Sequence, residues 1–214
     1  MLLRKIYQVG YRPTNRLFAT FPPSYIHPIF RHADQVALQE ANDFERHTFL
    51  PVRPANSSQT SSVFYDPLVA KFTNHIMRKG NKILARGLLE NTFMEIKRVQ
   101  LAKYATNPNV ELNPYKLLHQ AVANSRPFLQ TTPIKRGGHT YQVPIPIRPN
   151  ASLAIALEWL INAGKEKDDD TRFWKQLAKE IIDAAEGVGK VIKRKQDLHR
   201  VCEANRAYAH YRWG

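Results

Sequence analysis

Three consecutive carboxylates, Asp168–Asp170, are the residues best suited to metal-dependent chemistry in this sequence. Paired-metal hydrolysis needs carboxylates that converge in space, which adjacent loop residues rarely achieve. Lys165 and Lys167 flank the run, as is typical of an exposed loop, and Asp170 or Thr171 is suited to cap the next helix. A basic helical nucleic-acid enzyme, such as a metal-dependent nuclease, is therefore the alternative to a binding role.

The other patterns that could support catalysis are incomplete. Gly187-Val188-Gly189-Lys190 lacks the leading glycine spacing and the Ser or Thr of a phosphate-binding loop. The single cysteine, Cys202, excludes an internal disulfide framework and falls on the apolar side of a predicted helix, which favours a core thiol. The sequence therefore predicts no enzyme, no catalytic residue, no metal site and no cofactor.

Charge points to a different role. The 214 residues contain 32 Lys and Arg against 18 Asp and Glu, a formal net charge of +14. Such an excess is typical of proteins with a polyanionic partner. Hydrophobic residues make up 43%, which is too many for a wholly disordered basic tail. No apolar run approaches the ~20 residues that span a bilayer. The composition predicts a globular polyanion-binding protein.

Two segments concentrate this charge. Residues 112–157 contain no acid but several basic residues, so they can release counterions from nucleic acid. The C-terminal segment interleaves cations with Tyr208, Tyr211 and Trp213, and such aromatic planes can stack on unpaired bases. Packing of Tyr208 and Trp213 on the protein body is the alternative at this point.

These residues must be positioned by a mainly helical framework. Asp66-Pro67 and Asn113-Pro114 combine an N-cap with proline at the first helical position, and Asn81 opens the helix between them. The periodicity of apolar residues predicts further helices over 151–161, 173–185 and 191–211. The first of these is apolar nearly all round, which favours a central buried helix.

Between the third and fourth helices the apolar period changes to two. Tyr141, Val143, Ile145 and Ile147 alternate after the turn pair Gly137-Gly138, which predicts a β-hairpin. Pro144 and Pro146 remove two N–H groups from one strand edge, so that edge cannot extend a sheet. We expect a bundle of about six helices with one protruding, isolated β-hairpin ribbon.

The N-terminus differs in composition from this body. Residues 1–33 contain five basic residues and no acid, which predicts a mitochondrial transit peptide, with a retained basic arm as the alternative. Residues 34–62 are interpreted as an extension and linker, because 51–62 read PVRPANSSQTSS. Residues 63–214 are predicted to form the folded domain.

Four blocks in the body resemble a known family. They are DPLVAKF (66–72), GGHTYQVPIPIRP (137–149), LAKEIIDAA (177–185) and HRVCEANRAYAHYRW (199–213). In this order and at this spacing, the chain is similar to the universal small-subunit ribosomal protein seven family in its bacterial-type form. The family's six helices and one ribbon agree with the predicted elements.

The resemblance implies a structural role. Family members bind the 3′ major domain of small-subunit rRNA and start assembly of the head, beside protein neighbours of the head and platform. Their ribbon reaches toward the mRNA exit channel and the exit-site tRNA. Together with the N-terminus, this implies the mitochondrial small ribosomal subunit, and the plastid counterpart is the alternative.

The resemblance and the pattern of cations and aromatic residues together give the candidate RNA contacts, on the first two helices, the hairpin and its base, and the last helix. The candidates are Lys71, Arg78, Lys79, Lys82, Lys135, Arg136, Arg148, Lys193, Arg194, Lys195, Arg200, Arg206, Tyr208, His210, Tyr211, Arg212 and Trp213. The chain departs from the family at Ala151 and Ser152, where two basic residues are usual, and at Glu158, where Arg is common. Arg172-Phe173-Trp174 also replaces a small-residue stretch, so some rRNA contacts are expected to be lost or replaced.

Overall fold

The computed structural model describes residues 21, 22, 24–41, 48–56, 59, 60, 62 and 65–213. Contacts between residues divide the chain into two units, Met1–Tyr65 and Asp66–Gly214.

In the first unit, α1 (His32–Glu40) is accompanied by a parallel bridge between Ile26 and Val52. The expected boundary between residues 33 and 34 falls inside α1. Residues 1–20, most of the expected transit peptide, lie outside the described residues. The assignment of residues 1–33 as a transit peptide stays a prediction.

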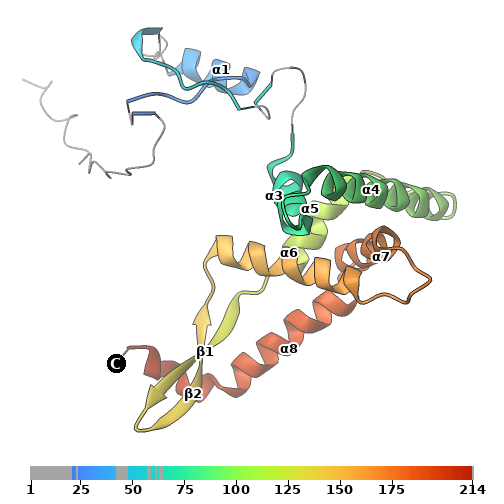
Figure 1. Cartoon of the computed structure of the whole chain (residues 1–214). Coiled ribbons are helices and arrows are strands. Elements are labelled where there is room, and N and C mark those ends of the chain that lie inside the picture. Colours follow the sequence, from blue (N-terminus) through green and yellow to red (C-terminus); the bar gives the residue numbers. More distant parts are fainter. Residues whose placement is uncertain are drawn as a thin grey trace, which may run out of the picture. The chain divides into compact units, whose positions relative to one another are not determined.

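The second unit contains the predicted helices and the ribbon (Figure 1). The elements, in chain order, are α3 (Pro67–Ile76), α4 (Lys82–Tyr104), α5 (Pro114–Ser125), β1 (Leu129–Arg136), β2 (His139–Pro146), α6 (Pro149–Lys165), α7 (Phe173–Ala185), α8 (Lys190–Ala204) and the 3-10 helix η1 (Arg206–Trp213). The mainly helical fold class is confirmed.

Side chains cap the first three helices of this unit at the predicted positions. The Asp66 carboxylate accepts a hydrogen bond from the Leu68 N–H at 2.8 Å. Asn81 and Asn113 accept in the same way at the starts of α4 and α5. These bonds satisfy amide groups that have no partner inside the helix, which is why these residue types mark helix starts. At α7 the expected cap by Asp170 or Thr171 is wrong, because Arg172 is the N-cap residue and no side chain caps this helix.

The core lies where α7 meets α4, α5 and α6. Leu118, Leu157 and Leu177 are fully buried there. Helices α6 and α7 approach closely at Gly164, since a Cβ atom at this position would lie 3.1 Å from the Leu177 Cβ. The 151–161 helix contributes Leu157, Leu160 and Ile161 to this core, as a central buried helix should. Its burial is incomplete, because Ile155 and Trp159 of α6 are only half-buried.

The predicted last helix, 191–211, is not continuous. It ends at Ala204 and the chain continues as η1. The Asn205 side chain donates a hydrogen bond from Nδ2 to the Val201 carbonyl at 2.8 Å. Short polar side chains of this kind compete with the helical backbone and favour helix ends. The change of direction brings η1 against β2.

The ribbon has the predicted register and turn. Leu129 pairs with Pro146 at its base and Arg136 with His139 at its tip. Gly137 and Gly138 both have positive φ, as a two-residue hairpin turn of type I′ requires. The Ile147 N–H donates to the Phe128 carbonyl, and N–H groups alternate in direction along a strand, so the nitrogens of Pro144 and Pro146 face away from β1.

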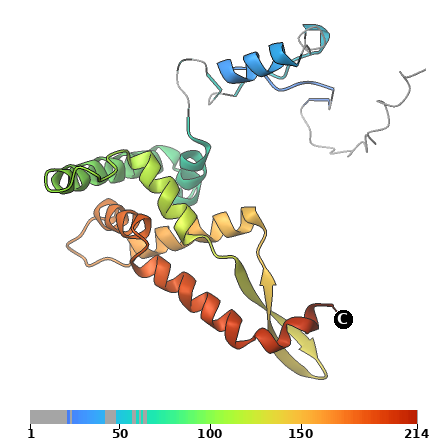
Figure 2. The ribbon, with the colours of Figure 1, turned by 180° about the vertical axis from the view of Figure 1, so that it is seen from behind.

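Within the described residues the ribbon joins no larger sheet, as expected, but it is not a free arm. Strand β1 packs beside α8 and β2 packs along η1, as both views of the unit show (Figures 1 and 2). Val143 is fully buried, although a free two-stranded ribbon leaves its side chains in water. The C-terminal segment therefore covers part of the ribbon, which corrects the expectation of a free arm.

Candidate nucleic-acid interface

Polar contacts fix the base of the ribbon to the helices. The Phe128 N–H donates to His199 Nε2 at 3.1 Å, and the Ser152 hydroxyl donates to the Pro127 carbonyl at 2.7 Å. The Arg126 guanidinium donates to the Pro149 carbonyl at 2.9 Å. Ser152 is one of the positions where the family usually has a basic residue, and here it is buried and braces the ribbon.

His199 is neutral in this arrangement, because its Nε2 accepts a hydrogen bond. Burial and the neighbouring Lys195 ammonium both lower the pKa of the imidazole. A histidine with a lowered pKa resists protonation in the folded state, so its contribution to stability is complete above its ordinary pKa of about 6.5. That contribution is lost as the pH falls through the lowered value.

We therefore expect acidification below pH ~6.5 to lower the unfolding temperature of the parent protein more than that of His199→Gln. The glutamine oxygen can still accept the Phe128 N–H bond but does not titrate. Thermal melts followed by circular dichroism from pH 7.5 to 5 check this difference. Parallel curves for the two proteins would contradict a role for His199.

The C-terminal aromatic residues pack on the ribbon. The ring centroids of Tyr208 and Tyr211 lie 5.0 and 5.1 Å from that of Tyr141 on β2. The Arg136 guanidinium lies over Tyr211 at 5.5 Å from the centroid. Trp213 differs, since 80% of it is exposed beside the Arg212 guanidinium. Of the two residues for which body packing was the alternative, Tyr208 packs and Trp213 does not.

The cations of α8 face different environments. Lys193 and Arg194 are exposed, and the Arg194 guanidinium lies over the Trp159 ring. Exposed Arg200 pairs with Asp197 at 3.4 Å. Lys195 instead donates to the Asn124 carbonyl at 2.6 Å, and burial lowers the pKa of its ammonium group. Lys195 therefore links α8 to α5, which the sequence pattern did not reveal.

The remaining candidate residues are spread over several elements of the same unit. Lys71 on α3 and three residues at the α3–α4 turn, Arg78, Lys79 and Lys82, are exposed. Lys71 lines a cavity with Asn150 at the start of α6. Exposed Arg148 is the N-cap residue of α6, and Lys135 is exposed near the ribbon tip. The positive end of the α6 dipole therefore lies between the α3 cation and the ribbon. Arg206 and His210 are exposed on η1.

A pocket lies between the base of the ribbon and the C-terminal segment. It has a volume of about 560 Å³ and is lined by Phe128, Leu129, Pro144, His199, Cys202, Glu203, Arg206 and Ala209. We call it the ribbon-base pocket. Phe128 is 71% exposed there. The sequence pattern did not indicate a role for Phe128 and His199, because residues 71 positions apart meet only through packing. The sequence offered one signal for this site, the aromatic residue Phe128 directly after Pro127, where the third predicted helix ends.

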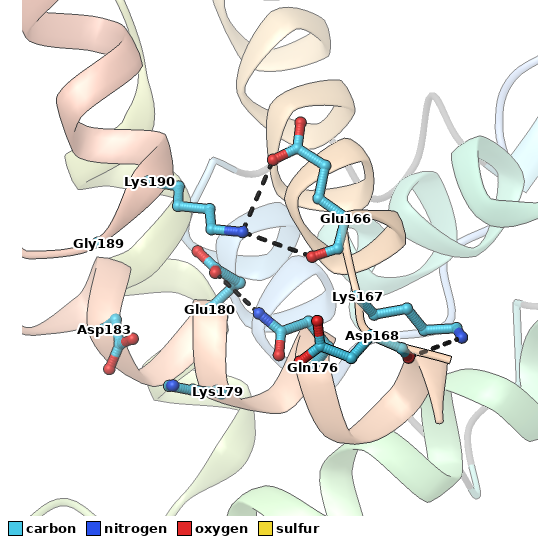
Figure 3. Close-up of a pocket in the computed structure, with 9 residues that line it drawn as sticks. All are labelled: Glu166, Lys167, Asp168, Gln176, Lys179, Glu180, Asp183, Gly189 and Lys190. Carbon is cyan, nitrogen blue, oxygen red and sulfur yellow. Dashed lines mark hydrogen bonds and ion pairs between the residues drawn. The ribbon is translucent and has the colours of Figure 1, made fainter. Parts of the chain in front are cut away.

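The carboxylates considered for metal chemistry lie at the opposite end of α8. Asp168 lines a hollow with Glu166, Glu180 and Asp183, interspersed with three lysines (Figure 3). Lys190 forms an ion pair with Glu166 at 3.7 Å. Asp169 and Asp170 are exposed in the loop before α7. In the described ranges, no group of three His, Cys, Asp or Glu residues is placed to hold a metal ion. The three consecutive carboxylates do not converge.

Glu180 is the buried member of this hollow. Its Oε1 accepts a hydrogen bond from Gln176 at 3.1 Å, while Oε2 has no hydrogen-bond partner among the described residues. Burial raises the pKa of the carboxyl group. Because the folded state favours the protonated form, ionisation as the pH rises through the raised value destabilises the protein.

Glu180→Gln is expected to increase the free energy of unfolding at pH 7.5, with a smaller gain at pH 4.5. The amide can keep the Gln176 hydrogen bond without a buried charge. Urea titrations at the two pH values measure both differences. A variant less stable than the parent at pH 7.5 would mean that attraction to Lys190 outweighs the desolvation of Glu180.

Exposed cations on several elements, a braced ribbon and an open apolar pocket together define a structural RNA-binding protein. The chain belongs to the ribosomal protein S7p/S5e family, whose model matches residues 45–206. Among similar proteins is "Small ribosomal subunit protein uS7m" of Drosophila melanogaster, 46% identical over 203 residues, which cover 92% of each chain. The protein of the same name from Bos taurus is 41% identical over 84% of this chain and 76% of its own.

A bacterial relative matches a shorter part of the chain. "Small ribosomal subunit protein uS7" of Caldicellulosiruptor saccharolyticus is 38% identical over 151 residues, 71% of this chain and 90% of its own. The predicted family is therefore confirmed. Family membership also decides against the nuclease alternative, because this is a family of structural proteins and not of enzymes.

Proposed function

We propose that this protein is a structural component of the small subunit of the mitochondrial ribosome. Membership of the S7p/S5e family is the observation that carries the proposal. The animal relatives are mitochondrial forms, and their similarity extends over most of this chain. The partners are rRNA and neighbouring ribosomal proteins. None of the helices in the described part of the chain has the length and apolar character needed to cross a bilayer.

We further propose that the protein binds the 3′ major domain of the rRNA and organises assembly of the head. The exposed cations of α3, the α3–α4 turn, the ribbon and α8 would hold phosphate groups. The ribbon, with Lys135 near its tip, would line the mRNA exit channel and the region of the exit-site tRNA. Proteins of the head and platform would be its neighbours.

Sedimentation tests the main proposal. The protein should migrate with the small subunit in a gradient of mitochondrial lysate, and its depletion should reduce the amount of that subunit. Crosslinking of the assembled particle, followed by sequencing of the bound RNA, should recover the 3′ major domain. Recovery of the protein only in free fractions would contradict the proposal.

The N-terminal organisation is a separate proposal. Residues 1–33 would direct import, residues 34–62 would form an extension, and residues 63–214 would bind RNA. A fluorescent fusion carrying residues 1–33 should enter mitochondria, and its accumulation in another compartment would contradict this. Mass spectrometry of the matrix protein would identify the N-terminus and show whether processing leaves Ile26, which pairs with Val52, in place.

A further inference from the structure

The ribbon-base pocket combines features that suit a planar ligand with hydrogen-bond donors and acceptors on its edge. Its volume of about 560 Å³ lies within the range of about 300–1,000 Å³ that is typical of small-ligand sites. Leu129, Pro144 and Ala209 supply apolar surface. The pocket is open to solvent through the exposed ring of Phe128.

Contacts with His199 and Lys195 order the Phe128 ring. Its backbone N–H is bonded to His199, and the two rings stack with centroids 6.0 Å apart and an interplanar angle of 25°. The Lys195 ammonium lies 5.4 Å from the centroid of the Phe128 ring. Because the ring is already ordered by these contacts and is still 71% exposed, a nucleobase could stack on its solvent-accessible surface with little further ordering cost.

Polar groups line the same pocket from η1 and the end of α8. Glu203 can accept hydrogen bonds from base N–H groups, and Arg206 can donate to base oxygens or ring nitrogens. Within residues 65–213, neither side chain forms an ion pair. Both groups are therefore available to a ligand with donors and acceptors on its edge.

We propose that the ribbon-base pocket binds one unpaired nucleobase of the small-subunit rRNA, stacked on Phe128 and hydrogen-bonded by Glu203 and Arg206. This inference rests on the proposed function, because it assumes that the protein binds that RNA. A base fits better than an apolar side chain of a protein neighbour, since the surrounding cations favour an attached phosphate backbone. Single-stranded RNA is generally held by such combinations of aromatic planes and cations.

Binding of the full-length protein to a transcript of the rRNA 3′ major domain tests this inference. Phe128→Ala should weaken affinity by about 5- to 150-fold, the effect of losing one stacked base, and Phe128→Tyr should restore most of it. The slope of log affinity against log salt should stay unchanged, because no phosphate contact is removed. Phe49→Ala, which truncates a phenylalanine that is 86% exposed in the first unit, is the control and should have no effect.

Glu203→Ala separates base recognition from simple charge attraction. Removing a carboxylate from a cationic surface strengthens binding if the pocket faces only phosphates. It should weaken binding if the carboxylate accepts hydrogen bonds from a base. Phe128 and Glu203 are exposed, so both variants should keep the parent's melting temperature.

The possible failures can be told apart. If Phe128→Ala and Glu203→Ala bind the transcript as tightly as the parent, the base site is wrong and the proposed ribosomal function stands. If these variants bind RNA normally but fail to join the small subunit, a protein neighbour fills the pocket, which also overturns the inference. If the parent protein does not bind the transcript, the proposed function itself fails.

Discussion

Replacing Lys193 and Arg194 together with alanine is expected to weaken rRNA binding by at least about 10-fold. Two charge-assisted hydrogen bonds to phosphate, at about 1.5–3 kcal/mol each, set an upper limit on the order of 10²- to 10⁴-fold. Both side chains are exposed on α8, and no ion pair engages either of them within residues 65–213. Removing two phosphate contacts should also lower the salt dependence of binding. Filter binding of the full-length protein at several salt concentrations measures both quantities.

The chain contains a matched control for this pair. Lys97 and Arg98 are also adjacent, exposed and helical, but they lie on α4 and outside the predicted contacts. Their replacement by alanine removes the same net charge. If it weakens binding as strongly as the α8 pair does, only the overall charge matters and α8 is not a specific contact surface.

Leu177→Ala is expected to have the largest effect on stability, a loss of about 2–5 kcal/mol. Leu177 is fully buried, and its Cβ lies opposite Gly164, where α6 and α7 approach closely. The truncation removes apolar contacts and leaves a cavity that tightly packed helices cannot easily close. Because whole domains are stable by only about 5–15 kcal/mol, the variant should unfold at a much lower urea concentration.

Leu101→Ala is the control for this experiment. Leu101 is also helical but 63% exposed, so the same truncation should change the free energy of unfolding by less than ~0.5 kcal/mol. Urea titrations at one pH compare the two variants directly. Equal losses would mean that the α6–α7 contact is not the centre of the core.

Local chemistry explains why many elements could be predicted. Asp66, Asn81 and Asn113 each satisfy amide groups within their own first turn, so the cap and its helix are adjacent in sequence. The paired glycines at 137 and 138 likewise allow the backbone conformation of a two-residue turn. These signals involve only a few neighbouring residues and do not depend on the rest of the fold.

The direction that the C-terminal segment takes after Asn205 depends on contacts with residues far away in the sequence. Helical periodicity continues through Asn205, yet the chain changes direction there and places Tyr208 and Tyr211 against Tyr141. The apolar area buried on the ribbon outweighs the preference for a longer helix, because propensity differs by less than ~1 kcal/mol per residue for most residue types. Sequence periodicity does not identify the surface that a segment will cover.

Distant contacts also determine the surroundings of the three adjacent carboxylates, which suggested metal chemistry in the sequence. In sequence, Asp168–Asp170 look like a cluster, whereas in the fold Asp168 lines a hollow with lysines and the other two are exposed in a loop. Conversely, the buried Glu180 gave no signal in the sequence. Burial sets the protonation of a carboxylate, and burial is a property of packing.

The sequence by itself determined the basic character, the helix starts, the hairpin and the resemblance to a ribosomal family, because each depends on residue type and near neighbours. Only the tertiary structure decided which cations face solvent and which, like Lys195, join two helices. It also brought Phe128 and His199 together and formed the ribbon-base pocket. The physical reason is that exposure and pockets arise from contacts between residues far apart in the chain.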